Sequence, residues 1–213
     1  MFARFVLAVA AMVTIVAASN FLVQFPVQAQ LGPINLADLL TWGAFTYPVA
    51  FLVTDLTNRH FGPQGARLVV IGGFAVAVVF SVWLATPRIA IASGTAFLVA
   101  QLLDVAIFDR LRAAAWWRAP LLSSVVGSVL DTLIFFTLAF AAPFSIMDTA
   151  FGRSDGSLAF PAPFLGLGPE VELWTSLAAG DFVVKLLVAA ALLAPYKVLR
   201  GLLADRVVNP AAV

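Results

Sequence analysis

Charged side chains lie inside stretches of the sequence that are otherwise apolar, and these residues are the ones best suited to chemistry. One stretch carries Asp181 and Lys185, four residues apart, and another carries Asp131. Residues four apart share one face of a helix, so Asp181 and Lys185 are expected to be neighbours. A charge at the centre of a membrane costs about 2.5–3.5 kcal/mol, so such residues usually face a bundle interior or a cavity. Lys185 could pair with Asp181 or Asp131, either to hold helices together or to open for a ligand.

Two further polar faces occur in other apolar stretches. Thr54, Asp55 and Asn58 share one helical face, and Gln101 and Asp104 share another. Both faces lie close enough to the expected membrane interface to be solvated. For these five residues a structural role therefore competes strongly with a role in binding.

Amide and aromatic side chains complete the set of candidate binding groups. Asn20 and Gln24 lie one turn apart in the first apolar stretch, and Trp42, Phe45 and Tyr47 cluster in the second. Carboxylates accept paired N–H donors, amides read carbonyl and amino edges, and rings stack on π-faces. The combination favours a planar, polar small molecule, although Trp42 alone would also suit an interfacial aromatic belt.

The amino-acid composition indicates which class of protein holds these candidate residues. The chain has 213 residues, of which 62% are hydrophobic and 11% charged. Soluble domains are only about 45–50% apolar, so an ordinary soluble enzyme, a disordered chain and a nucleic-acid binder are excluded. The chain has no Cys and only one His, which argues against thiol chemistry and His-rich metal sites. We expect an integral membrane protein in the lipid bilayer, with no catalytic residues, metal or cofactor.

Six apolar windows are long enough to cross a bilayer, which needs about 20 helical residues. They lie near residues 4–26, 37–57, 66–86, 89–108, 120–142 and 173–195. Nine of the twelve Lys and Arg residues fall on one side of these windows; Arg88 and Arg153 fall on the other, and Lys185 lies within a window. The positive-inside rule then places both termini in the cytoplasm. The predicted fold is one all-α domain, residues 1–213, forming a six-helix transmembrane bundle.

Two segments allow more than one interpretation. The N-terminal apolar run resembles a secretory signal peptide, but it continues to Phe25, longer than the usual apolar region of such a peptide. The Pro- and Gly-rich segment 143–172 is expected to be an irregular external loop. It could be a solvated connector, or a lid whose apolar stretch Phe160–Leu165 touches the membrane or a pore mouth.

Several motifs, in order and spread over most of the chain, resemble the YhhQ-type queuosine-precursor transporters. They are Thr41–Pro48, Thr54–Gly62, Gln101–Arg112, Trp116–Pro120, Asp131–Thr132, and Asp181–Phe182 with Lys185. The resemblance implies a multi-pass importer in the bacterial inner membrane. Its expected substrates are the cyano and aminomethyl forms of 7-deazaguanine, carried by alternating access for tRNA modification. It also implies that no ATPase partner is needed.

Substrate chemistry suggests roles for the candidate residues. A 7-deazaguanine presents N1–H and a 2-amino group side by side, and a carboxylate can accept both. Asp181 is the first candidate acceptor, since it lies in the outer half of its window, where substrate would enter. Asn20 and Gln24 would read the remaining edge while an aromatic residue of window 37–57 stacks on the ring. Asp104 and Asp55 are the reserve acceptors.

Two other functions remain open at this stage. A vitamin-binding subunit would need an external ATPase, because the chain lacks a phosphate-binding Gly-x-x-x-x-Gly-Lys loop. An intramembrane aspartyl protease would need two aspartates sharing a proton, and Asp131 and Asp181 would be the candidates. The motif expected around such aspartates is absent, which disfavours the protease. The oligomeric state is also open, with a homodimer as one option.

Overall fold

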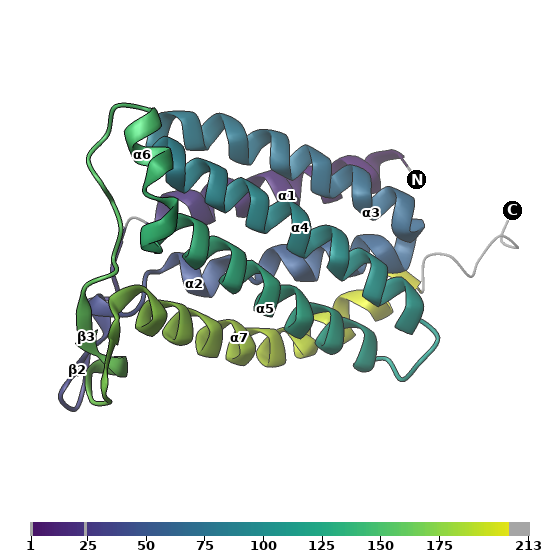
Figure 1. Ribbon diagram of the computed structural model, residues 1–213. Coiled ribbons are helices and arrows are strands. Elements are labelled where there is room, and N and C mark those ends of the chain that lie inside the picture. Colours follow the sequence, from purple (N-terminus) through teal and green to yellow (C-terminus); the bar gives the residue numbers. More distant parts are fainter. Residues whose placement is uncertain (1, 24, 205–213) are drawn as a thin grey trace, which may run out of the picture.

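The computed structural model describes residues 2–23 and 25–204, and long helices dominate it (Figure 1). The helices run roughly antiparallel between two ends of the molecule, and α1 starts at the same end where α7 stops. The long helices are α1 (Phe2–Leu22), α3 (Val49–Leu84), α4 (Pro87–Leu111), α5 (Arg118–Phe140) and α7 (Leu173–Ala204). A helix satisfies its own backbone N–H and C=O groups, as a hydrocarbon environment requires. The prediction of a helical bundle is confirmed.

A sharp break divides α3 into two parts. Gly62 has φ 78° and ψ 178°, a conformation that glycine adopts readily because it has no Cβ. Pro63 follows, and its nitrogen has no hydrogen to continue the helical hydrogen-bond ladder. Figure 1 shows the chain reversing direction at this point, so the two parts of α3 lie as separate rods in the bundle.

Contacts with α1 show the direction of the first of these parts. Ser19 Oγ donates a hydrogen bond to Thr46 Oγ1 at 3.0 Å, near the C-terminal end of α1. Arg4, at its other end, lies 3.4 Å from the ring nitrogen of His60. The chain from Thr46 to His60 therefore runs antiparallel to α1, and the part of α3 after Gly62 returns alongside it (Figure 1).

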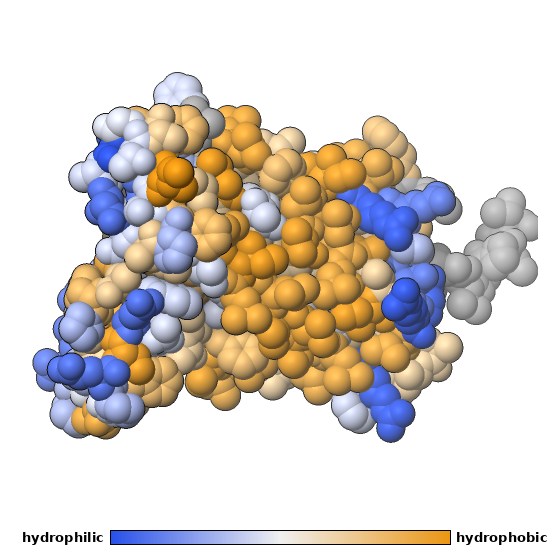
Figure 2. Space-filling view, viewed as in Figure 1, coloured by the Kyte–Doolittle hydropathy of each residue, from blue (hydrophilic) through white to orange (hydrophobic). Residues whose placement is uncertain are grey.

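Five helical segments among the described residues are long and apolar enough to cross a membrane. They are Phe2–Leu22, Gly43–Ser81, Pro87–Leu111, Arg118–Phe140 and Leu173–Leu203. The second has 39 residues and holds most of the predicted windows 37–57 and 66–86, on either side of Gly62. Figure 2 shows, on the face in view, an apolar band between two hydrophilic ends. These features are those of a multi-pass membrane protein.

The first two predicted windows have the wrong boundaries. α1 ends at Leu22 rather than 26, and the second helical segment begins at Gly43 rather than 37. Between them, Pro26 and Thr41 form an antiparallel bridge, and Pro26 has no N–H with which to prolong a helix. A short 3-10 helix, η1 (Leu36–Asp38), and the four-residue helix α2 (Gly43–Thr46) precede α3. Apolar composition predicted a span here, but the backbone bends instead.

Short elements gather at the end of the bundle opposite the termini (Figure 1). They are the hairpin β1 (Gln30–Leu31) and β2 (Ile34–Asn35), η2 (Ala142–Phe144), α6 (Ile146–Ala150), η3 (Phe164–Gly166), and the hairpin β3 (Pro161–Pro163) and β4 (Glu170–Glu172). The prediction that 143–172 is irregular throughout is therefore wrong. Gly166, with φ 79°, lies in the turn that lets β3 pair with β4, whereas Pro161 and Pro163 lie within β3.

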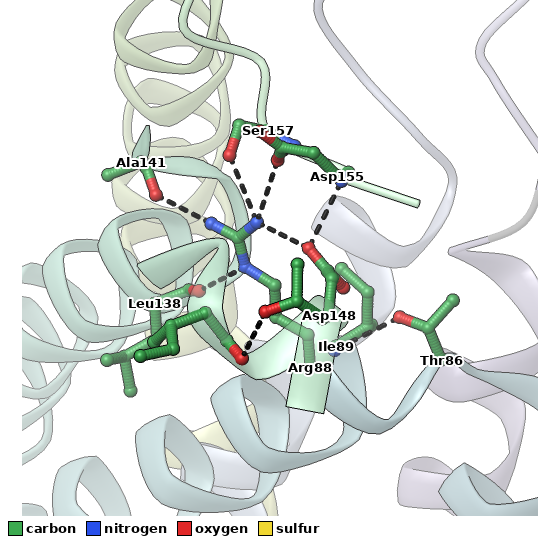
Figure 3. A network of polar contacts seen from close by, with 11 residues as sticks. Thr86, Arg88, Ile89, Leu138, Ala141, Asp148, Asp155 and Ser157 are labelled. Carbon is green, nitrogen blue, oxygen red and sulfur yellow. Dashed lines mark hydrogen bonds and ion pairs between the residues drawn. The ribbon is translucent and has the colours of Figure 1, made fainter. Parts of the chain in front are cut away.

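Arg88 connects several segments at this end of the molecule through hydrogen bonds and an ion pair (Figure 3). Its side chain is buried, and its guanidinium donates to the backbone carbonyls of Leu138 at 2.9 Å and Ala141 at 2.6 Å. It also forms a 2.8 Å ion pair with Asp148 and a 3.1 Å hydrogen bond to Ser157. One arginine in the first turn of α4 thus ties the end of α5, α6 and the following loop together. The sequence reasoning treated Arg88 only as a topology marker.

Close helix contact deeper in the bundle positions the polar residues. A Cβ at Gly127 of α5 would lie 2.7 Å from the ring of Phe51, so α5 can approach α3 only because this residue is glycine. Met12, Val69 and Phe97 belong to a buried apolar cluster that joins α1, α3 and α4. Rigid packing of this kind holds the facing side chains of the four helices in fixed positions.

Candidate functional site

A cavity of about 480 Å³ opens between the helices in the half of the bundle away from the termini. Its size falls in the range of small-molecule sites, about 300–1,000 Å³. Residues from α1, the 37–43 segment, α3, α4, α5 and α7 line it. Of the predicted binding residues, it brings together Asn20, Tyr47, Asp131, Asp181 and Lys185.

A buried charged centre lies in the wall of this cavity. The Lys185 ammonium is 2.7 Å from Asp131 Oδ2 and 2.5 Å from Asp181 Oδ2, so it pairs with both carboxylates at once. Tyr47 donates a 2.9 Å hydrogen bond to Asp131 Oδ1, and Thr132 donates at 3.1 Å to Asp181 Oδ2. Lys185 was predicted to pair with Asp181 or with Asp131, and the structure confirms both ion pairs.

The two carboxylates of this centre are not equivalent. Asp131 receives donors on both oxygens, from Tyr47 and Lys185. At Asp181, the hydrogen bond and the ion pair seen among the described residues both fall on Oδ2. Its side chain is also more accessible, at 14% against 6% for Asp131. Asp181 is therefore the carboxylate better placed to accept a hydrogen bond from a ligand.

Aromatic rings form much of the remaining wall. The contributors are Tyr47, Phe80, Phe97, Phe135, Phe136 and Phe140. The Lys185 ammonium lies 5.4 Å from the centre of the Tyr47 ring, close enough for a cation–π interaction. Flat apolar faces beside a charged centre suit a planar ligand with polar edges. The sequence reasoning missed the phenylalanines, although three of them cluster between residues 135 and 140.

One aromatic residue of window 37–57 was predicted to stack on the ligand, and the structure places Trp42 and Phe45 away from the cavity. They are 49% and 36% exposed, contact each other, and are not among the described residues lining the cavity. Tyr47 is the aromatic residue of this segment that reaches the cavity. Trp42 and Phe45 are three residues apart and share one helical face, whereas Tyr47, two residues after Phe45, lies on the opposite face.

The end of the cavity away from the termini is lined by residues that the prediction only partly named. Asn20 lines it, and its amide nitrogen donates to Val16 O at 3.0 Å, while Gln24 lies outside the described residues. The segment around Leu39, Leu40 and Thr41 contributes to the wall. Within the described part of the chain, no residue of 143–172 lines the cavity, so the lid interpretation of that loop gains no support.

The remaining predicted residues form a second buried cluster, nearer the termini. Thr54, Asp55, Asn58, Gln101 and Asp104 are all 0–1% exposed, so the expectation that they are solvated is wrong. Their two helical faces point at each other: Thr54 Oγ1 donates to Gln101 Oε1 at 2.6 Å, and Asn58 Nδ2 donates to the carbonyl of Val105 at 2.9 Å. Helices α3, α4 and α5 close over this cluster, which is separate from the cavity.

The geometry also bears on the protease alternative. A protease dyad needs two carboxyls that share a proton. Here the Lys185 ammonium lies against both Asp131 and Asp181 and offsets one of their two negative charges. That arrangement suits ligand binding and ion-pair exchange rather than peptide hydrolysis.

Comparison with known proteins agrees with a transport role. Curated relatives include a "Probable queuosine precursor transporter" of Haemophilus influenzae, 35% identical over 85% of this chain and 79% of the relative. Another is the "Queuosine precursor transporter" of Escherichia coli, 33% identical over 93% of this chain and 87% of the relative. No solved structure gives a significant match.

A family model described as "Putative vitamin uptake transporter" matches residues 41–86 and 80–199. These ranges include the charged centre, the aromatic walls and the second polar cluster. The match extends over more than half of the chain, and the curated relatives are transporters rather than enzymes. The chain belongs to this vitamin uptake transporter family of membrane proteins.

Proposed function

We propose that the protein imports queuosine precursors, 7-cyano-7-deazaguanine or 7-aminomethyl-7-deazaguanine, across the bacterial inner membrane. The observation that carries the proposal is the cavity in which a Lys185-paired Asp181 faces a wall of aromatic rings. The names of the two relatives support the same substrate class.

The proposed topology has six crossings, both termini in the cytoplasm and the cavity open to the outside. The reversal at Gly62 supports six crossings, because it turns the longest helical segment into two rods. The excess of Lys and Arg at the end that holds the termini supports the orientation. Alternating access would then open the opposite half of the bundle toward the cytoplasm.

Recognition of the base would centre on Asp181. One donor of the 7-deazaguanine, N1–H or the 2-amino group, would bind Asp181 Oδ1. The second would take the place of the Thr132 hydroxyl, which is 3.1 Å from Oδ2. The ring system would lie between Tyr47 and the phenylalanines of α4 and α5. Asn20 would meet the remaining polar edge.

Uptake by the purified protein in liposomes tests this proposal. We expect mass-detected 7-cyano-7-deazaguanine to enter vesicles that contain the protein alone, and preloaded vesicles to exchange it with external base. Guanine and hypoxanthine serve as comparison bases. Absence of both uptake and exchange would overturn the proposal, and activity only after addition of an ATPase module would favour the vitamin-binding subunit.

A further inference from the structure

The second polar cluster contains two carboxyl groups that no buried cation balances. Asp55 is 1% exposed and Asp104 is 0% exposed. Among the described residues, no salt bridge involves either one, whereas Asp131 and Asp181 share Lys185. Two ionised carboxylates held together in a membrane interior would be strongly unfavourable.

Several polar atoms of this cluster also lack a partner within the described residues. They are both carboxylate oxygens of Asp104, Asn58 Oδ1 and Gln101 Nε2. Asp55 on α3 and Asp104 on α4 belong to the two helical faces that the Thr54–Gln101 hydrogen bond brings together, but two carboxylates bring no hydrogen with which to bond each other. A proton on one of them supplies the missing donor and removes one charge. Buried polar groups are rarely left unsatisfied, so these atoms point to a missing bound species.

The neighbouring polar and charged groups neither neutralise the two carboxyls nor supply Asp104 with a hydrogen-bond donor. Arg59 on α3 approaches the pair, but its guanidinium donates to Arg112 O at 2.8 Å and to the Tyr196 hydroxyl at 3.4 Å. From α7, Tyr196 lines a small pocket together with Asp55, and Arg200 lies one turn further along the same helix. From α5 the pair meets the Ser123 hydroxyl, which donates to Asp55 Oδ1 at 3.2 Å. Ser123 can donate to only one acceptor at a time, which leaves Asp104 dependent on a proton.

We propose that Asp55 and Asp104 form a proton-binding site that couples substrate import to the proton gradient. This inference rests on the proposed import function. In the state seen here the two carboxyls hold one shared proton, which they took from the outside solution before the helices closed over the pair. When the half of the bundle near the termini opens, water reaches the pair and the proton leaves to the cytoplasm together with the substrate. No covalent bond changes, and one proton moves inward per transport cycle.

The experiment separates coupling from transport itself. Two assays use proteoliposomes and 7-cyano-7-deazaguanine, a neutral base. The first measures exchange of internal for external base at equal pH. The second measures net uptake when the outside is one pH unit more acidic. One proton per substrate would allow accumulation of up to about tenfold for a one-unit gradient. For Asp104→Asn and Asp55→Asn we expect exchange to continue and gradient-driven accumulation to disappear. Asp109→Asn removes a half-exposed carboxylate paired with Arg112 on the same helix, and it should behave as wild type.

Each result supports or overturns the coupling site. Wild-type exchange without any response to the gradient would overturn it, and so would full accumulation by Asp104→Asn. Loss of wild-type exchange would instead mean that the import function is wrong. If neither Asn variant inserts, Asp104→Glu and a pH-sensitive dye inside wild-type vesicles replace them. Accumulation by the Glu variant with acidification of the lumen upon substrate entry is expected. An unchanged lumen pH, or accumulation that requires sodium, would refute a proton site.

Discussion

Replacing Lys185 with alanine perturbs the charged centre most directly. The ammonium lies 2.7 Å from Asp131 and 2.5 Å from Asp181, and its loss leaves two buried carboxylates without a cation. Breaking a buried ion pair by removing one partner costs about 3–5 kcal/mol. One carboxyl can avoid this by binding a proton, which at pH 7 and an ordinary Asp pKa of about 3.9 costs about 4 kcal/mol. Both routes predict a loss of about 4 kcal/mol in the free energy of unfolding.

The proton route makes this loss depend on pH. Protonation of a carboxyl becomes easier by about 1.4 kcal/mol for each unit by which the pH falls. We therefore expect the stability deficit of Lys185→Ala to shrink to about 2 kcal/mol at pH 5.5. The variant should still insert into the membrane. It should fail to transport at either pH, because the carboxyl that takes the proton no longer offers the acceptor geometry that Lys185 maintains.

Thermal unfolding in detergent at pH 7 and pH 5.5, beside uptake into proteoliposomes, measures both effects. Lys197→Ala is the matched control, since Lys197 is an exposed lysine of α7 that stacks on Trp116 outside the cavity. We expect this control to transport normally. Wild-type uptake by Lys185→Ala would refute a functional charge pair. A stability deficit that is equal at both pH values would refute the protonation argument.

Three further predictions address recognition, the outer end and topology. Asp181→Asn should weaken binding of 7-cyano-7-deazaguanine about 5- to 150-fold in calorimetry, because an unpaired donor costs about 1–3 kcal/mol; undiminished affinity would remove Asp181 from recognition. Arg88→Ala should lower stability by about 3–5 kcal/mol in thermal unfolding, since Asp148 is left buried and unpaired; an unchanged unfolding temperature would contradict this role. The chain has no native Cys, so single cysteines at the exposed positions Ser154 and Ala114 can be labelled selectively. Labelling of Ser154→Cys from outside and Ala114→Cys from inside is expected, and the reverse pattern would invert the topology.

The helical membrane class follows from the sequence, because backbone groups in lipid need internal partners and a continuous apolar run of about 20 residues obtains them by forming a helix. The Asp181–Lys185 pair was equally predictable, since residues four apart on a helix are neighbours whatever surrounds them. The contact between Lys185 and Asp131 was one of two alternatives until the packing of α5 against α7 was known. Helical periodicity identifies the face on which a residue lies, but it does not identify the helix opposite that face.

The boundaries of the helices and the burial of their polar residues depended on tertiary contacts, which a hydropathy profile does not contain. Window 37–57 seemed continuous because its residues are apolar, yet Pro26 and Thr41 form a bridge and the helical segment begins only at Gly43. Asp104 was expected near solvent because of its depth along the helix. In the structure it is fully buried, because solvation depends on whether neighbouring helices cover a face.

Residue types and their spacing along the chain thus determined the membrane class, the charged pair and the polar faces. Tertiary packing alone decided which of these groups share the cavity and which form a second, closed cluster. It also decided that Arg88 would bind Asp148 and the last carbonyls of α5 at the end of the bundle opposite the termini. The physical reason is range: hydropathy and helical spacing act between residues that are close in sequence. The contacts of Lys185 with Asp131 and of Arg88 with Asp148 join residues 54 and 60 positions apart, which only the folded chain brings together.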